Sequence, residues 1–295
     1  MSRRVAIVTD STCDLPPELA AKHEITVVPL MVSLDGREYQ DGVDIRPREF
    51  YRRLEASSAM PTTATPGPGR FAEAYEALLR THDRVLSIHI SGDLSATVGA
   101  ATQGARMVDA DRITIVDSRV VSIALGLAVL GAVKALDEGA GPDDAWARVK
   151  PAVDAMRVYF LVGTLEYLRR GGRIGRAGAL VGSVLQIKPV LTLTEGVVAP
   201  MERVRTSEKA MARLIELARG KGERVCAAVG HTGGPEGAER LAAAIEDQCD
   251  TMVMVPVGPV VGAHGGPGLV GFGCYPADIL PLGMGRITSE ESLVR

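Results

Sequence analysis

The segment Arg84–Val116 reads RVLSIHISGDLSATVGAATQGARMVDADRITIV. Its short apolar runs at Arg84–His89 and Ile113–Val116 predict two strands, because both are rich in β-branched and aliphatic residues. The stretch Ser95–Val108 between them predicts a helix, and Ser91–Leu94 is the loop that precedes it. Strands that follow one another through a helix run parallel in one sheet. This segment therefore predicts an α/β protein built on a mainly parallel sheet.

The same alternation continues on both sides of this unit. A β-branched run at Val5–Thr9 predicts the first strand, and Ile25–Leu34 predicts one or two more, followed by the hairpin turn Asp35-Gly36. The segment Pro61–Pro68 contains three prolines, so we expect it to have no regular structure. Helices are expected from Pro16 towards His23 and at Pro47–Ala56, Phe71–Arg80 and Val121–Asp137.

The second half of the chain follows a break at Gly139–Pro142. At roughly 150 residues per domain, 295 residues predict two domains. We expect residues 1–157 to form an N-terminal α/β domain with a mainly parallel sheet flanked by helices, and residues 158–295 to form a C-terminal α/β (α+β) domain. Elements expected in the second half are strands at Val158–Val162, Lys188–Leu193, Val197–Val204, Val225–Val229 and Met252–Val257, and helices from Asp143 and at Glu208–Arg219 and Pro235–Gln248.

Composition and charge exclude several classes of protein. The chain has 33 Lys and Arg against 36 Asp and Glu, and this balance excludes a generally basic nucleic-acid-binding protein. With 46% apolar and 23% charged residues it is an ordinary globular sequence. The uncharged stretch Val120–Val133 is too short to span a membrane, and Thr251–Ala277 is broken by prolines. Scattered cysteines and the lack of a signal peptide predict a cytoplasmic protein.

Four polar segments combine hydroxyl groups or glycines with predicted strand ends and loops. Ligands of parallel sheets bind beyond the carboxyl ends of the strands, where helix N-termini point their N–H groups outward. Asp10–Asp14 and Ser91–Ser95 occupy such ends, and Thr62–Thr65 adds three hydroxyls. The segment Gly262–Gly268 places His264 between glycines on a predicted loop, where no packing role accounts for it. We therefore interpret His264 as functional, whereas helix capping explains either serine-containing loop equally well.

Signatures of catalysis and cofactor binding are mostly missing. The sequence contains no GxSxG, no HExxH and no P-loop, so it predicts no metal and no cofactor. The glycine series at Gly172, Gly175 and Gly178 is a weak nucleotide signal, because no clear strand leads into it. Four arginines lie within the same turn, and we interpret them either as a solvated face or as a docking site for phosphate or an acidic partner. They are Arg169, Arg170, Arg173 and Arg176.

The segment Thr164–Ile174, TLEYLRRGGRI, is the most distinctive of a series of motifs along the chain. The others are Val8–Pro16, Pro61–Thr63, Ile90–Thr97, Lys188–Leu191, Val204–Thr206 and Gly262–Gly268. Taken in this order, the motifs resemble the DegV family, the fatty-acid-binding proteins that include the FakB subunits of bacterial fatty acid kinase. The ordered set covers nearly the whole chain, which makes it far more specific than any one motif.

The resemblance implies a two-domain α/β protein that buries a fatty acid between or within its domains. The residues that match the family's carboxylate ligands are Thr63, Ser91, the backbone amide of Gly92, Ser95 and His264. The chain departs from the usual family pattern at Gly92, where a second serine is usual. It departs again at Gly266, where threonine is common, and at Thr65, where glutamine is more frequent. The change at Gly92 removes a hydroxyl but keeps the amide.

The resemblance also implies that the protein performs no chemistry itself. It presents the carboxylate of a long-chain fatty acid to a separate ATP-dependent kinase, which forms the acyl phosphate. Arg173 and Arg205 are then our candidates for kinase docking. Burying a methylene contributes roughly 0.8 kcal/mol, so the acyl tail dominates the affinity. The aliphatic run Ala177–Ile187 fits a channel for the tail, and an ordinary core explains it as well.

Two functions of other classes remain open at this point. One is a stand-alone hydrolase or phosphotransferase that uses Ser91 or Ser95 as nucleophile and His264 as base. The other is a regulatory protein that senses acyl chains and binds a partner other than the kinase. An assay of the isolated protein on ester and phosphate substrates distinguishes a hydrolase or phosphotransferase from a carrier. Identification of partners captured from a cell extract distinguishes a regulatory protein from a carrier.

Overall fold

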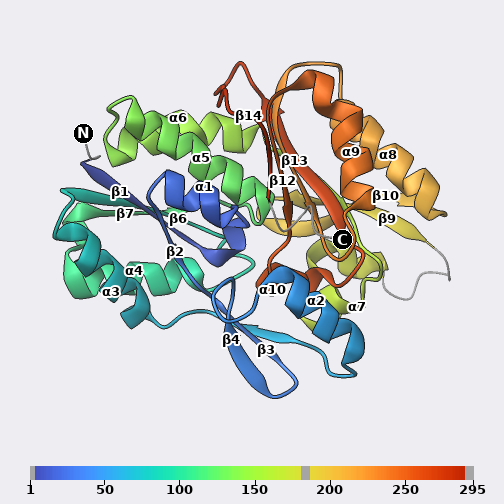
Figure 1. Cartoon of the computed structure of the whole chain (residues 1–295), viewed down its shortest axis with the longest axis horizontal. Helices are drawn as coiled ribbons and strands as arrows, with labels where there is room; N and C mark the ends of the chain where they lie inside the picture. Colours follow the sequence, from blue (N-terminus) through green and yellow to red (C-terminus); the bar gives the residue numbers. More distant parts are fainter. Residues whose placement is uncertain (1–3, 181–186, 290–295) are drawn as a thin grey trace.

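The computed structural model describes residues 4–180 and 187–289, and within these ranges the strands form three sheets (Figure 1). The N-terminal sheet is parallel throughout, with strand order β2-β1-β6-β7, as predicted. A small antiparallel sheet beside it has the order β4-β3-β5. The bounds of these strands are β1 Val5–Asp10, β2 Ile25–Val28, β3 Met31–Leu34, β4 Arg37–Gln40, β5 Thr62–Ala64, β6 Arg84–His89 and β7 Ile113–Asp117.

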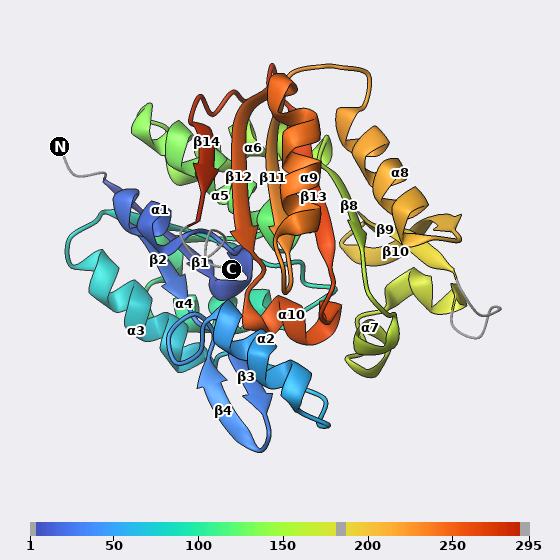
Figure 2. The same cartoon turned by 45° about the vertical axis from the view of Figure 1, so that its right-hand side comes forward.

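The C-terminal sheet is mixed and has the order β10-β9-β8-β13-β11-β12-β14 (Figure 2). Strands β10 to β11 of this order pair antiparallel, while β11, β12 and β14 pair parallel. The bounds are β8 Arg157–Leu161, β9 Lys188–Thr194, β10 Val197–Val204, β11 Val225–His231, β12 Cys249–Pro256, β13 Val270–Pro276 and β14 Gly285–Thr288. The chain is therefore an α/β protein with one parallel and one mixed sheet.

The helices lie in layers around the two large sheets. Helices α3 and α4 cover one face of the N-terminal sheet, and α8 and α9 cover the outer face of the C-terminal sheet (Figure 1). Helix α5 contacts both sheets and lies between them. The bounds are α1 Pro17–Lys22, α2 Pro47–Ala56, α3 Pro68–Leu79, α4 Thr97–Val108, α5 Ile123–Asp137, α6 Pro142–Asp154, α7 Glu166–Arg170, α8 Ser207–Arg219, α9 Glu236–Ile245 and α10 Pro259–Gly265.

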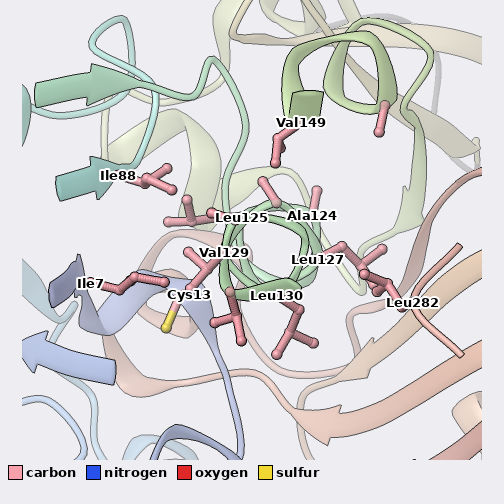
Figure 3. Close-up of a cluster of buried hydrophobic side chains, with 14 of the residues drawn as sticks. Ile7, Cys13, Ile88, Ala124, Leu125, Leu127, Val129, Leu130, Val149 and Leu282 are labelled. Atoms are coloured by element: carbon pink, nitrogen blue, oxygen red, sulfur yellow. The ribbon is translucent and has the colours of Figure 1, made fainter. Parts of the chain in front are cut away.

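Helix α5 is apolar around its whole circumference because it is buried on all sides. Its side chains meet Ile7 and Ile88 of the N-terminal sheet on one side and Leu282 on another (Figure 3). A helix that is hydrophobic all round belongs either in a core or in a membrane, and α5 lies in the core. No helix in residues 4–180 or 187–289 has the length and apolar character needed to cross a bilayer.

Two predictions about local structure are wrong. The segment Pro61–Pro68 does contain a strand, because Thr62–Ala64 is free of proline and pairs with β3 at the edge of the small sheet. Gly262–Gly268 is only partly a loop, since its first residues end helix α10, which begins at Pro259. His264 therefore lies in the last turn of a helix and not on a loop.

The proposed boundary at residue 157 stays a prediction. Residues from both sides of it pack in one cluster around α5, including Ile7 and Ile88 from the N-terminal half and Cys226 and Val253 from the C-terminal half. The two halves consequently share a continuous core, and any site between them is bordered by both.

Candidate ligand-binding site

A cavity lies where the loops of the N-terminal sheet meet α10 and strands of the C-terminal sheet. It encloses about 1010 Å³ when the open space at its mouth is included. Most of its wall is apolar. These side chains are Leu30, Ile90, Leu94, Val121, Ile123, Val158, Phe160, Leu168, Leu193, Val198, Val257, Val260, Val261, Leu269 and Phe272.

Five polar residues of the wall make hydrogen-bond contacts either with one another or with a residue adjacent to one of them in the sequence. They are Thr63, Thr65, Ser95, Arg173 and His264. Thr63 Oγ1 lies 2.8 Å from His264 Nε2, which links β5 to α10 across 201 positions of sequence. Ser95 Oγ lies 3.3 Å from Thr65 Oγ1. The structure thus brings together three of the predicted ligand residues, Thr63, Ser95 and His264.

Helix α10 is held tightly, which fixes the position of His264. A methyl group at Gly262 would lie 2.1 Å from the Tyr51 hydroxyl, so only glycine allows this approach. That hydroxyl donates to the Val257 carbonyl at 2.8 Å, just before the helix. The helix ends at Gly266, whose φ of +71° suits glycine, and the Tyr167 ring packs against it. The Tyr167 ring leaves no room for a side chain at position 266, which explains why this chain has glycine where threonine is common in the family.

Burial controls the charge of His264. It lowers the pKa of the imidazole to about 4, and the positive charge of Arg173 contributes in the same direction. At neutral pH the ring is therefore uncharged and carries one N–H. Its Nδ1 is buried with no hydrogen-bond partner among the residues described, and the Gly171 backbone packs against it. This arrangement favours the Nε2–H tautomer, in which the ring donates to Thr63 and leaves the Thr63 hydroxyl free to donate to a ligand.

Arg173 also lines the cavity, a placement that the docking interpretation did not include. Its Nε donates to the Leu94 carbonyl at 3.1 Å, and its Nη1 donates to the Gly171 carbonyl at 2.7 Å. The guanidinium is thus fixed beside the polar residues of the cavity. Arg205 is exposed between β10 and α8 and does not line the cavity.

Ser91 and Gly92 are placed elsewhere. The Ser91 side chain is fully buried and donates to the Gly196 carbonyl at 2.9 Å, so it joins the two halves of the chain. The Gly92 amide donates to Asp117 at 3.1 Å. Neither residue lines this cavity, and their assignment as carboxylate ligands stays a prediction.

The wall is mainly aliphatic and also contains aromatic side chains. Phe160 and Phe272 line it, although aromatic residues are rare in the chain. Phe272 lies on β13, a strand that sequence patterning did not predict. Within the run Ala177–Ile187, Ala177 and Leu180 pack in a cluster that shares Leu168 and Val198 with the cavity wall, and residues 181–186 lie outside the described residues.

Fold and site together define a class: an α/β protein with one parallel and one mixed sheet and with an apolar cavity whose polar residues are hydroxyls, a neutral imidazole and a guanidinium. Such a cavity complements a molecule with an apolar body and an anionic end. The chain matches the sequence profile described as "Uncharacterised protein, DegV family" over residues 4–277. This protein belongs to the DegV family.

Similar proteins extend over almost the same length. A DegV domain-containing protein of Streptomyces coelicolor is 41% identical over 277 residues, 92% of this chain and 98% of that protein. The structure of a DegV family protein from Thermus thermophilus, described for its fatty acid binding, matches with a TM-score of 0.87 and 37% identity over 93% of this chain and 100% of that one. DegV of Bacillus subtilis, described as a fatty acid binding protein, matches with a TM-score of 0.85 and 32% identity, covering 93% and 100%.

Proposed function

We propose that this protein binds a long-chain fatty acid, with the acyl chain in the apolar cavity and the carboxylate beside Thr63 and His264. One observation carries the proposal: an apolar cavity that includes a hydrogen-bonded hydroxyl–imidazole pair and a fixed guanidinium. The fatty acid binding of the Thermus thermophilus and Bacillus subtilis relatives supports the same ligand class.

The energetics assign separate roles to the two ends of the ligand. Each buried methylene contributes about 0.8 kcal/mol, so a chain of ~15 methylenes supplies at most about 12 kcal/mol before the costs of association. A buried carboxylate must recover its lost hydration through hydrogen bonds. The Thr63 and Ser95 hydroxyls provide donors, and Arg173 provides positive charge. The tail thus provides the affinity, and these polar groups fix the orientation.

The site lacks features that a stand-alone hydrolase needs. Thr63 and His264 have the spacing of a nucleophile and a base, but no acidic group among the described residues orients the His264 Nδ1. A Ser87–His89–Asp10 arrangement does exist, with contacts of 2.7 and 2.9 Å. All three of its side chains are fully buried, so a substrate has no access to them. Both observations favour a binding protein over an enzyme.

We further propose that the protein presents the carboxylate to a separate ATP-dependent kinase in the cytoplasm, which forms the acyl phosphate. Arg173 lies at the polar part of the cavity, where it is suited to contact the carboxylate and the phosphate that replaces it. Arg205 is exposed and available to a partner protein. The other possibility from the sequence, an acyl sensor, has no specific observation in its favour.

Displacement of a fluorescent fatty acid tests the binding proposal. The wild-type protein should release the probe when oleate is added, and His264→Ala should require roughly 10-fold more oleate because the carboxylate loses its organised donor. His82→Ala is the matched control, since His82 bonds to its own helix and does not line the cavity. A wild-type protein that takes up neither the probe nor oleate would refute the proposal.

A further inference from the structure

The cavity proposed to hold the acyl chain is called the acyl cavity below. Two buried carboxyl groups outside it contact the start of α10, the helix that carries His264. Asp14 Oδ1 accepts a hydrogen bond from the Gly258 amide at 2.9 Å, and Asp14 Oδ2 accepts one from the Ser122 hydroxyl. The ionised Asp41 carboxyl is stabilised by the Ser11 hydroxyl and, to a smaller extent, by the Val260 amide, and Asp41 is only 3% exposed. Gly258 and Val260 lie at the start of α10, in the C-terminal half of the molecule. Both carboxyl groups come from the N-terminal half, so they connect the two halves at this point.

The contact around Gly258 is close. A methyl group there would lie 2.8 Å from Asp14 Oδ1 and 3.3 Å from Asp41 Oδ1, so both carboxyl groups approach the same backbone position. Asp14 adopts a φ of 49°, which is uncommon for a residue with a side chain, and this conformation is held by the bonds to Gly258 and Ser122. Asp41 Oδ2 is buried and has no hydrogen-bond partner among the described residues.

Solvent reaches this pair by a separate route. Asp14 and Asp41 line a second cavity of about 1100 Å³, its open side included, and this cavity shares no lining residue with the acyl cavity. Burial raises the pKa of Asp14 to about 7. Burial, and then the charge of Asp14, raises the pKa of Asp41 to about 8. The pair therefore retains at least one proton at neutral pH and exchanges it with water through the second cavity.

Arg46 carries positive charge and lines the second cavity with the pair, whereas the other titratable groups near the pair add no positive charge. Burial raises the pKa of both the Cys13 thiol and the Tyr51 hydroxyl, so neither ionises near neutral pH. The charge of Asp10 adds to the repulsion. The groups that face the pair from the surrounding elements are Asp10, Cys13, Arg46 and Tyr51.

We propose that Asp14 and Asp41 are positioning residues for His264: they hold the first turn of α10 against the N-terminal half and thereby set the imidazole opposite Thr63. When both carboxyl groups ionise, their mutual repulsion loosens this end of the helix. The inference rests on the proposed function, because it assigns a consequence for fatty acid binding to groups that do not touch the ligand.

The first test compares oleate affinity at pH 7 in the wild-type protein, Asp41→Ala and Asp41→Asn. Alanine removes the acceptor beside the Val260 amide and should weaken binding ~10-fold, whereas asparagine keeps a carbonyl oxygen and should restore most of the affinity. Asp154→Ala, which removes an exposed carboxylate of α6, controls for the change in net charge. Binding to Asp41→Ala that equals the wild-type value overturns the proposal.

The second test is a pH profile. Between pH 7 and pH 9 the wild-type affinity should fall ~5-fold relative to Asp41→Asn, in which the doubly ionised pair cannot form. Taking the ratio of the two proteins at each pH cancels the titration of oleate itself. Identical profiles for the two proteins count against the proposal.

The third test needs no ligand. It therefore separates the positioning role of Asp41 from the proposed binding of a fatty acid. The NMR signal of the His264 ring should shift in Asp41→Ala and return towards its wild-type position in Asp41→Asn. If the wild-type protein binds no oleate, the proposed function fails, but this signal still decides the positioning role. A His264 signal that is unmoved in Asp41→Ala refutes it.

Discussion

The chemistry of the site depends on the neutral state of one imidazole. His264 is kept uncharged by burial beside Arg173, and its hydrogen bond to Thr63 orients the hydroxyl rather than activating it. With the ring uncharged, the proposed carboxylate meets positive charge at Arg173 and hydrogen-bonding groups at Thr63 and His264. The same burial makes the protein sensitive to acid.

Acid should destabilise the folded protein through His264. Its folded pKa of about 4 lies below the unfolded value of 6.5, so the stabilising effect is complete above pH 6.5 and is lost as the pH falls through 4. The shift corresponds to about 3 kcal/mol in the free energy of unfolding. Urea unfolding at several pH values should show this loss in the wild-type protein and much less of it in His264→Gln. Parallel curves for the two proteins would contradict the assignment.

Thr63 offers a test with an adjacent control. Thr63→Val keeps the shape of the side chain but removes the hydroxyl that faces His264, and we expect the dissociation constant for oleate to rise roughly 10-fold. Thr62→Val makes the same change on the exposed neighbour in β5 and should leave affinity unchanged. Calorimetric titration of the two variants checks this, and equal affinities would remove Thr63 from the site.

At the scale of elements, α10 has little freedom to move. Gly262→Ala places a methyl group against the Tyr51 hydroxyl and should cost about 1–3 kcal/mol of stability, with weaker oleate binding because His264 moves. Gly99→Ala in α4 is the control: its methyl group meets open space within the described structure and should be neutral or stabilising by up to about 1 kcal/mol. Thermal unfolding that ranks the two variants equally would contradict this account of α10.

The elements that sequence patterning predicted include the unit from β6 to β7, where short apolar runs flank a helix, and α5, whose long apolar run exceeds the length of a strand. The strand β5 and the helix α10 were not predicted, because proline and glycine dominate both segments and their structure depends on distant partners: β3 for the strand and Tyr51 for the helix. The pairing of Thr63 with His264 rested on a family resemblance, since no local pattern connects residues 201 positions apart.

The contacts of Ser91 and Gly92 could not be predicted from their motif alone. A strand end rich in hydroxyls predicts a binding loop, but whether a given side chain points into a cavity depends on the opposing half of the chain. The Ser91 hydroxyl donates to the Gly196 carbonyl and the Gly92 amide donates to Asp117, so Leu94 and Ser95 are the residues of this loop that line the cavity.

At the scale of the whole molecule, we expect fatty acid binding and acyl-phosphate formation by the proposed kinase to depend on different residues. Arg205→Ala should weaken acyl-phosphate formation by the kinase roughly 10-fold while oleate affinity stays unchanged, because this side chain is exposed and does not line the cavity. Arg203→Ala, exposed on the neighbouring strand β10, serves as the control. The assay follows acyl phosphate with purified kinase and ATP, and equal loss of binding and transfer in Arg205→Ala would refute a docking role.

The two halves meet around α5 and enclose the acyl cavity between their loops and strands, so the most direct measurement is a crystal structure of the protein with stearate. Electron density for the hydrocarbon chain should fill the cavity along Phe160 and Phe272, and a carboxylate oxygen should lie about 3 Å from Thr63 Oγ1. Crystals grown in saturating stearate whose cavity stays empty, or whose ligand places its carboxylate away from Thr63 and His264, would contradict the account.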